Sequence, residues 1–182
     1  MTFKTFLSTA TAIALGTAVY AANPTVGGEP MLIERNIIEN AVNSPVHTTL
    51  VAAVKAADLV ETLQGPGPFT VFAPVNDAFA ALPAGTVETL LMPENKAMLQ
   101  KVLTAHVVAG DWSAADIIAA ARASKDGFYH FNAVSGDALS AQVKGNNVYI
   151  IDESGNAARV TVADVDQSNG VIHVINAVLV PK

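Results

Sequence analysis

The chain has 182 residues, of which 51% are hydrophobic and only 14% are charged, a composition typical of one well-cored globular domain and not of a disordered chain. Ten basic and 16 acidic residues give a net charge of −6 without any basic run, so nucleic acid is not expected as a partner. The lack of cysteine excludes disulfides and a lipid anchor on that residue, and a domain of this size can bury enough surface to fold without such crosslinks.

The N-terminus has the pattern of a secretory signal peptide. Lys4 precedes an apolar run from Phe6 to Val19, and small residues, Val19 and Ala21, occupy the two positions that a signal peptidase reads. The run is short for a membrane span, and no later stretch approaches the roughly 20 apolar residues that a span needs. An amphipathic N-terminal helix of the domain is the alternative interpretation.

This pattern predicts an exported chain in three parts. We expect a signal peptide at residues 1–21 with cleavage near Ala21, a flexible leader rich in Pro and Gly at 22–33, and one domain at 34–182. The mature product is expected to be periplasmic or secreted, without a transmembrane segment, and monomeric.

Helical periodicity dominates the first two-thirds of the predicted domain. Apolar residues recur every three to four positions in segments 37–42, 48–57, 59–63, 83–91 and 94–104. Asn76-Asp77 is predicted to cap a further short helix, and Ser113 with Asp116 resembles a capping box that starts a helix running to Ser124. Segment 69–73 is apolar at both alternating positions, which predicts a strand covered on both faces, and 106–110 reads as a short strand.

The hydrophobic period changes to two in the last third of the chain. Strands are predicted at 141–144, 148–152, 159–165 and 171–180, separated by Gly- and Asn-containing turns that are typical of hairpins. Helices followed by an antiparallel meander indicate an α+β fold.

Three stretches of the sequence resemble the fasciclin domain family. Segment 67–79, GPFTVFAPVNDAF, resembles the first hallmark box of the family, and segment 169–181, NGVIHVINAVLVP, resembles the second. Between them, LTAHVV at 103–108 lies where the family usually has a Tyr-His pair. The likeness covers about Asn36 to Pro181, and two long boxes in this order are a specific signal.

The resemblance implies a fold and a class of function. The fold would be a wedge of antiparallel β-strands packed with several α-helices, and the function would be adhesion or binding of proteins or glycans, without a known catalytic activity. Ala105 replaces the usual tyrosine, and Asn176 stands where Asp is common. The chain therefore gives no support for the integrin contact that animal relatives make around that tyrosine.

The apolar strand near the C-terminus carries two polar residues, His173 and Asn176, which must point to opposite faces because side chains alternate along a strand. Each needs its own partner, since an unpaired polar group in such a setting costs about 1–3 kcal/mol. We predict a structural polar cluster that docks the terminal strand on the helical half of the domain; its members are Asn76, Asp77, His106 and Asn176. The catalytic alternative makes His106 a base oriented by Asp77, but no nucleophile stands in a recognisable setting.

Other motifs of enzymes and metal sites are weak in this sequence. The four histidines form no close pair, and the segment from Asp164, DVDQSNG, departs from a calcium loop because its glycine falls one place late. No G-x-S-x-G, phosphate-binding loop or cysteine nucleophile is found. We expect no cofactor, no metal and no enzymatic activity.

Aromatic residues are the remaining candidates for a binding surface. Trp112 is the only tryptophan, and Phe128 to Phe131 form an aromatic cluster after Gly127. These rings either close the end of the core or contribute to a protein or glycan contact. The candidate binding surface consists of Trp112, Tyr129, His130 and His173, of which His173 is either a partly covered histidine or a surface contact residue.

The sequence favours an exported binding module for adhesion or for association with the cell surface or extracellular matrix, through a protein or glycan partner. The alternative is a small-ligand carrier or sensor with a pocket between helices and sheet, which would need an apolar cavity of roughly a few hundred Å³. A hydrolase using His106 and Asp77 is the third hypothesis.

Overall fold

A computed structural model describes residues 23–181; the predicted signal peptide, its cleavage site and Lys182 lie outside this range. The helices of the described part are α1 (Ile37–Asn43), α2 (Thr48–Ala56), α3 (Val60–Gln64), α4 (Asn76–Ala80), α5 (Thr86–Leu90), the 3-10 helix η1 (Pro93–Asn95), α6 (Lys96–Thr104) and α7 (Ala114–Ala123). The strands are β1 (Thr25–Val26), β2 (Glu29–Pro30), β3 (Phe69–Pro74), β4 (Val107–Ala109), β5 (Phe128–Asn132), β6 (Ala138–Lys144), β7 (Asn147–Ile151), β8 (Ala157–Gln167) and β9 (Gly170–Ile175). No helix within this range is long and apolar enough to cross a bilayer.

One curved sheet organises the fold. Its strand order is β4-β3-β9-β8-β7-β6-β5, and the strands from β5 to β9 form a continuous antiparallel meander, as the change of period to two predicts. The neighbouring strands β3 and β9 are parallel, with Phe69 opposite Gly170. The two hallmark boxes of the sequence therefore lie side by side within the sheet, flanked by β4 on one side and β8 on the other.

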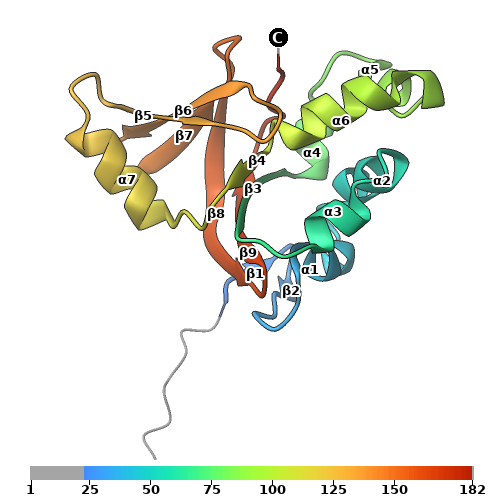
Figure 1. Ribbon diagram of the computed structural model, residues 1–182, viewed down its shortest axis with the longest axis horizontal. Helices are drawn as coiled ribbons and strands as arrows, with labels where there is room; N and C mark the ends of the chain where they lie inside the picture. The colour runs from blue at the N-terminus through green and yellow to red at the C-terminus, as the bar shows by residue number, and fades with distance from the viewer. Residues whose placement is uncertain (1–22, 182) are drawn as a thin grey trace, which may run out of the picture.

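The sheet separates two hydrophobic cores. Helices α1 to α6 gather on one side of it, whereas α7 lies on the other side (Figure 1). Along β3, Val71 and Ala73 face the first core and Phe72 faces the second, and β9 alternates in the same way. Both strands are mostly apolar, with the buried residues Thr70 and His173 as polar exceptions, because both of their faces are covered.

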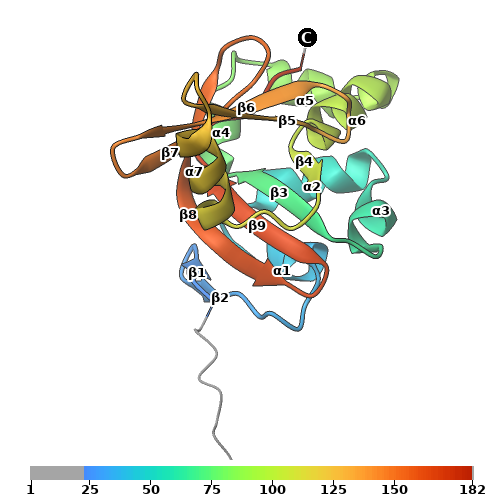
Figure 2. The same cartoon turned by 60° about the vertical axis from the view of Figure 1, so that its left-hand side comes forward.

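The meander curls around the second core. Strands β5, β6 and β7 lie at the top of the molecule in Figure 2, with α7 below them, and α7 packs against β5 and β6. After β5 the chain returns to β4, where the Val134 N–H donates to the Val107 carbonyl at 2.7 Å. This contact connects the two ends of the sheet and closes the curl.

The structure corrects four local expectations. Helix α4 begins after Val75 without a side-chain cap, so Asn76-Asp77 does not cap it. Strand β5 was not predicted, because aromatic residues occupy both alternating positions of its sequence FYHF and hide the period of two. Strand β9 ends at Ile175, five residues before the predicted end. In the predicted leader, Val26 and Met31 are buried in the first core. The predicted capping box of Ser113 and Asp116 is confirmed at the start of α7.

Two glycines allow β3 and β9 to start side by side. A Cβ atom on Gly170 would lie 1.9 Å from the Phe69 carbonyl oxygen, and one on Gly67 would lie 2.0 Å from the Asn169 carbonyl oxygen. Gly170 also has a φ of 149°, which residues with a side chain rarely adopt. Only glycine fits this crossing of the two hallmark boxes.

Candidate functional site

His106 is a structural residue whose two ring nitrogens both bind backbone. It follows α6, and its Nδ1 donates to the Val102 carbonyl at 2.8 Å while its Nε2 accepts from the Leu179 N–H at 2.9 Å. The imidazole is therefore neutral. Burial lowers the pKa of His106 to about 4, although the Val102 hydrogen bond and the Asp152 carboxylate oppose this effect.

Asp152 is the second side chain that holds the C-terminal segment, and sequence analysis identified it only as the last residue of the predicted strand 148–152. Its Oδ2 accepts from the Val180 N–H at 2.9 Å, and its Oδ1 accepts from the backbone of Ser154 and Asn156. His106 and Asp152 thus bind consecutive backbone amides of a segment without regular structure. We name this pair the terminal clamp.

The four residues of the predicted polar cluster do not share hydrogen bonds. Asn76 accepts from the Thr49 N–H at 3.0 Å and donates to the Pro45 carbonyl, so it stabilises the start of α2 from outside that helix. Asn176 is exposed, and its side chain accepts from the Arg159 N–H at 2.8 Å. Asp77 is exposed. The expected docking of the C-terminal segment exists, but the terminal clamp performs it, because β9 ends before Asn176.

The catalytic pair of His106 and Asp77 is not formed. Both ring nitrogens of His106 are engaged with backbone, and its side chain is only 3% exposed, so a substrate proton cannot reach them. No hydrogen bond of Asp77 to His106 is found in the described range. This geometry argues against the hydrolase hypothesis for these two residues.

His173 is buried and does not belong to a surface. It points into the second core from β9, where its Nε2 donates to the Trp112 carbonyl at 2.8 Å and its Nδ1 accepts from the Asp164 N–H at 3.3 Å. Burial lowers the pKa of His173, and the hydrogen bond to Trp112 opposes this. The histidine fixes the loop that enters α7, which answers why an apolar strand carries it.

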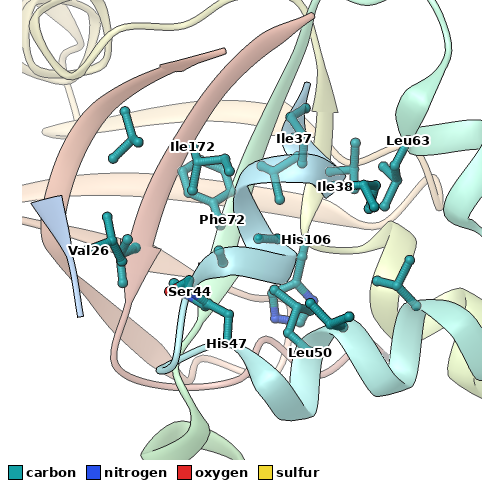
Figure 3. A pocket seen from close by; sticks show the side chains of 18 of the residues that line it. Val26, Ile37, Ile38, Ser44, His47, Leu50, Leu63, Phe72, His106 and Ile172 are labelled. Atoms are coloured by element: carbon teal, nitrogen blue, oxygen red, sulfur yellow. Dashed lines mark hydrogen bonds between the residues drawn. The ribbon is translucent and has the colours of Figure 1, made fainter. Parts of the chain in front are cut away.

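An apolar cavity lies between the sheet and helices α1 and α2 (Figure 3). Its volume is about 40 Å³, and its walls are almost entirely apolar, with Ile38, Leu50 and Ile172 among them. His47, the residue before α2, lines the cavity and hydrogen-bonds to Ser44. Burial lowers the pKa of His47, and a hydrogen bond with the Ala73 backbone opposes this effect. A drug-sized ligand needs roughly 300 Å³ or more, so this cavity does not support the carrier alternative.

Trp112 and Tyr129 belong mainly to the second core. Both are partly buried; their ring centroids lie 5.5 Å apart, and the Tyr129 ring contacts the Phe131 ring at 5.3 Å. Phe131 in turn packs on Phe72, which is 1% exposed. Trp112 and Tyr129 therefore mainly close the end of the second core, which is one of the two predicted alternatives for these rings.

His130 lies on the opposite face of β5 and is exposed. Its Nε2 contacts Asp126 Oδ2 at 2.9 Å, and its Nδ1 contacts the Ser140 hydroxyl at 2.8 Å. Hydrogen bonds from Ser124 and His130 lower the pKa of Asp126, which also accepts from the Phe128 N–H at the start of β5. Asp126 lies in the turn before the edge strand β5, and a charge beside a free edge hinders pairing with another strand, so this group helps to protect the edge of the sheet.

His130 belongs to the outer face of β5 to β8, which we name the outer platform. Directly opposed residues of neighbouring strands point to the same side, and the inner members Leu139, Ala141, Val148 and Ile150 are buried in the second core. The outer members of the central row are Phe128, Gln142, Tyr149 and Arg159. The next row consists of His130, Ser140, Ile151 and Ala157.

The platform combines aromatic and basic groups. The Phe128 and His130 rings are stacked with centroids 6.0 Å apart, and the Lys144 ammonium lies 5.7 Å from the centre of the Tyr149 ring. Phe128, Gln142 and Tyr149 are partly exposed, and Arg159 is exposed. Sequence reasoning singled out His130 alone from this face, because the other members are recognised only once the strand register is known. No group of three or more metal-binding side chains occurs within residues 23–181.

Comparison with known proteins assigns the family. The profile of the Fasciclin domain matches residues 45–181. Protein sll1483 of Synechocystis is 54% identical over 145 residues, which cover 80% of this chain and 73% of that protein. The cell surface glycolipoprotein MPB83 of Mycobacterium bovis is 31% identical over 180 residues, covering 93% of this chain and 72% of that protein.

A solved structure confirms the predicted α+β architecture. The pair of FAS1 domains from the insect cell adhesion molecule Fasciclin I aligns with a TM-score of 0.70 at 18% identity; the alignment covers 80% of this chain and 50% of that one. The profile match spans both hallmark boxes, whose strands β3 and β9 pair in parallel within the sheet. The chain therefore belongs to the fasciclin domain family.

Proposed function

We propose that this fasciclin domain is an exported, non-enzymatic binding module that acts in adhesion or in association with the cell surface or matrix. The observation that carries the proposal is the division of roles between its polar side chains. The side chains of His106 and His173 bind only backbone groups within residues 23–181, and Asp152 binds backbone amides and the Asn156 side chain, whereas the outer platform presents aromatic and basic groups to solvent. Recognition then belongs to the exterior of the domain.

Two further observations support this proposal. The N-terminal pattern is that of a signal peptide, and MPB83, a relative that shares most of its length with this chain, is named a cell surface glycolipoprotein. The module is proposed to work as a monomer. Its partner is proposed to be a cell-surface or matrix protein or glycan.

Crosslinking on intact producing cells tests the proposal. The chain is expected to be captured on an envelope or matrix component, and the capture should persist in His106→Gln when that variant is folded. Recovery of the chain inside the cytoplasm, or with a stoichiometric small molecule in native mass spectrometry and no envelope partner, would refute it. Light scattering of the purified chain checks the monomeric state.

A further inference from the structure

We infer that the outer platform binds an acidic oligosaccharide, one that bears carboxylate or sulfate groups; this inference rests on the proposed binding function and deepens it. The inference is based on the central row of the platform. In this row one residue from each of four neighbouring strands lies directly opposite the next: Phe128, Gln142, Tyr149 and Arg159. No residue of this row takes part in either hydrophobic core.

The chemistry of the row suits a sugar chain. The C–H faces of a pyranose ring are apolar and slightly positive, so they pack on the negative face of an aromatic ring. Phe128, stacked with His130, offers one such ring at the free edge, and Tyr149 offers a second two strands away. Gln142 stands between them with an amide that can donate to and accept from sugar hydroxyls.

The charges of the platform favour an anionic sugar. The guanidinium of Arg159 has no hydrogen bond or ion pair to any of residues 23–181, and Lys144 contacts the Tyr149 ring. The two nearby carboxylates are already engaged: Asp126 with Ser124 and His130, and Glu153 with the Ala138 N–H. Both carboxylates keep their charge, but Asp126 lies beside the edge strand β5 and Glu153 binds the Ala138 end of β6, whereas Lys144 and Arg159 supply two positive charges at the other end of the platform. A planar guanidinium matches a carboxylate or sulfate in geometry as well as charge.

The size of the platform distinguishes a glycan from a protein partner. Four strands span about 14 Å across the platform. Along the strands, the two rows given above and the outermost pairs Asn132–Ala138 and Lys144–Asn147 make four rows that span about 20 Å, which gives a planar area of about 300 Å². A standard protein interface needs about 800 Å² on each side and a cluster of large buried anchors. The platform has one aliphatic anchor, Ile151, and polar groups between its rings. A short sugar chain laid across the strands fills this area.

Binding of defined oligosaccharides to the purified chain tests the inference. The probes are a hexamer of galacturonic acid and maltohexaose, a neutral hexamer. The uronate is expected to bind at least tenfold more tightly, with amide chemical-shift changes confined to β5–β8, and to weaken as salt rises from about 0.05 to 0.5 M. Arg159→Gln and Tyr149→Ala should each weaken binding about tenfold. Arg122→Gln removes the same charge from the exposed side of α7 and should change binding less than twofold.

Three results would overturn the inference. These are equal affinity for the neutral hexamer, equal losses in Arg159→Gln and Arg122→Gln, and shift changes located outside the platform. Circular dichroism checks that Tyr149→Ala remains folded, and Arg159→Gln provides an independent variant because the Arg159 guanidinium makes no hydrogen bond or ion pair within residues 23–181. The proposed function is tested separately: a chain that is captured on envelopes but ignores the uronate retains the function and loses this site.

Discussion

Acidification is expected to weaken the fold through His106. In the folded chain burial lowers its pKa to about 4, whereas the unfolded chain has the ordinary value of 6.5. Between these values the unfolded chain binds a proton that the folded chain does not, so the free energy of unfolding falls as the pH drops from 6.5 toward 4. Above pH 6.5 the contribution is fully retained, because His106 is neutral in both states.

The magnitude follows from the two pKa values. The full loss is about 3 kcal/mol below pH 4, and about 2 kcal/mol of it is reached at pH 5. Protonation would force Nε2 to become a donor and break its bond with the Leu179 N–H, so the terminal clamp opens with it. Burial also lowers the pKa values of His47 and His173, which adds to the loss in the same direction.

Urea unfolding at pH 7.5 and pH 5 measures the effect, with Trp112 fluorescence and circular dichroism as probes. His106→Gln keeps a donor and an acceptor but does not titrate. Its stability deficit relative to the wild type is therefore expected to shrink by about 2 kcal/mol at pH 5. Leu103→Ala is the control, because it removes a buried neighbour worth about 2–5 kcal/mol without a titrating group. Equal deficits of His106→Gln at both pH values would refute the assignment of a neutral buried imidazole.

Three further predictions concern stability. Gly170→Ala should lower the free energy of unfolding by more than about 3 kcal/mol or prevent folding, because the new Cβ would meet the Phe69 carbonyl. The control Gly28→Ala places its Cβ within 4 Å of no atom and should cost about 1 kcal/mol, and thermal melts compare the two variants. Asn76→Ala should destabilise the chain by about 1–2 kcal/mol, because it removes the hydrogen bonds that hold the start of α2. Asp77→Ala is the control and should cost under about 0.5 kcal/mol; an equal loss in both variants would contradict this role of Asn76. Asp152→Ala should expose the Val180 amide to hydrogen exchange and cost about 2–4 kcal/mol, while unchanged protection of that amide would argue against the clamp.

Much of the architecture could be predicted because periodicity reports burial directly. The apolar run of β3 predicted cover on both faces, and the two hydrophobic cores provide it. The capping box of Ser113 and Asp116 was recognisable because its signal is local. The parallel pairing of β3 with β9 could not be derived in this way, since it joins segments 101 residues apart at Phe69 and Gly170.

The candidate sites were harder to predict because their members depend on register and on where strands end. His106 was expected to meet Asn176, but β9 stops at Ile175 and the chain then turns, so Leu179 reaches the imidazole instead. His173 was expected to be partly covered or a surface contact, whereas two backbone partners make its full burial tolerable. Tyr149 and Arg159 carried no motif at all.

The residues that bury the second core also decide what the outer platform presents. A slip of one residue in the pairing of β6 with β7 would turn Tyr149 inward and Ile150 outward, because side chains alternate with a period of two. The buried side chains Leu139, Ala141 and Ile150 oppose such a slip, since each is at most 1% exposed. Beyond Val160 the pairing of β8 with β9 is irregular, so the straight row ends near Arg159. Recognition at the surface and packing in the interior are therefore two consequences of one register, and a core substitution that loosens it should disturb binding without touching a platform side chain.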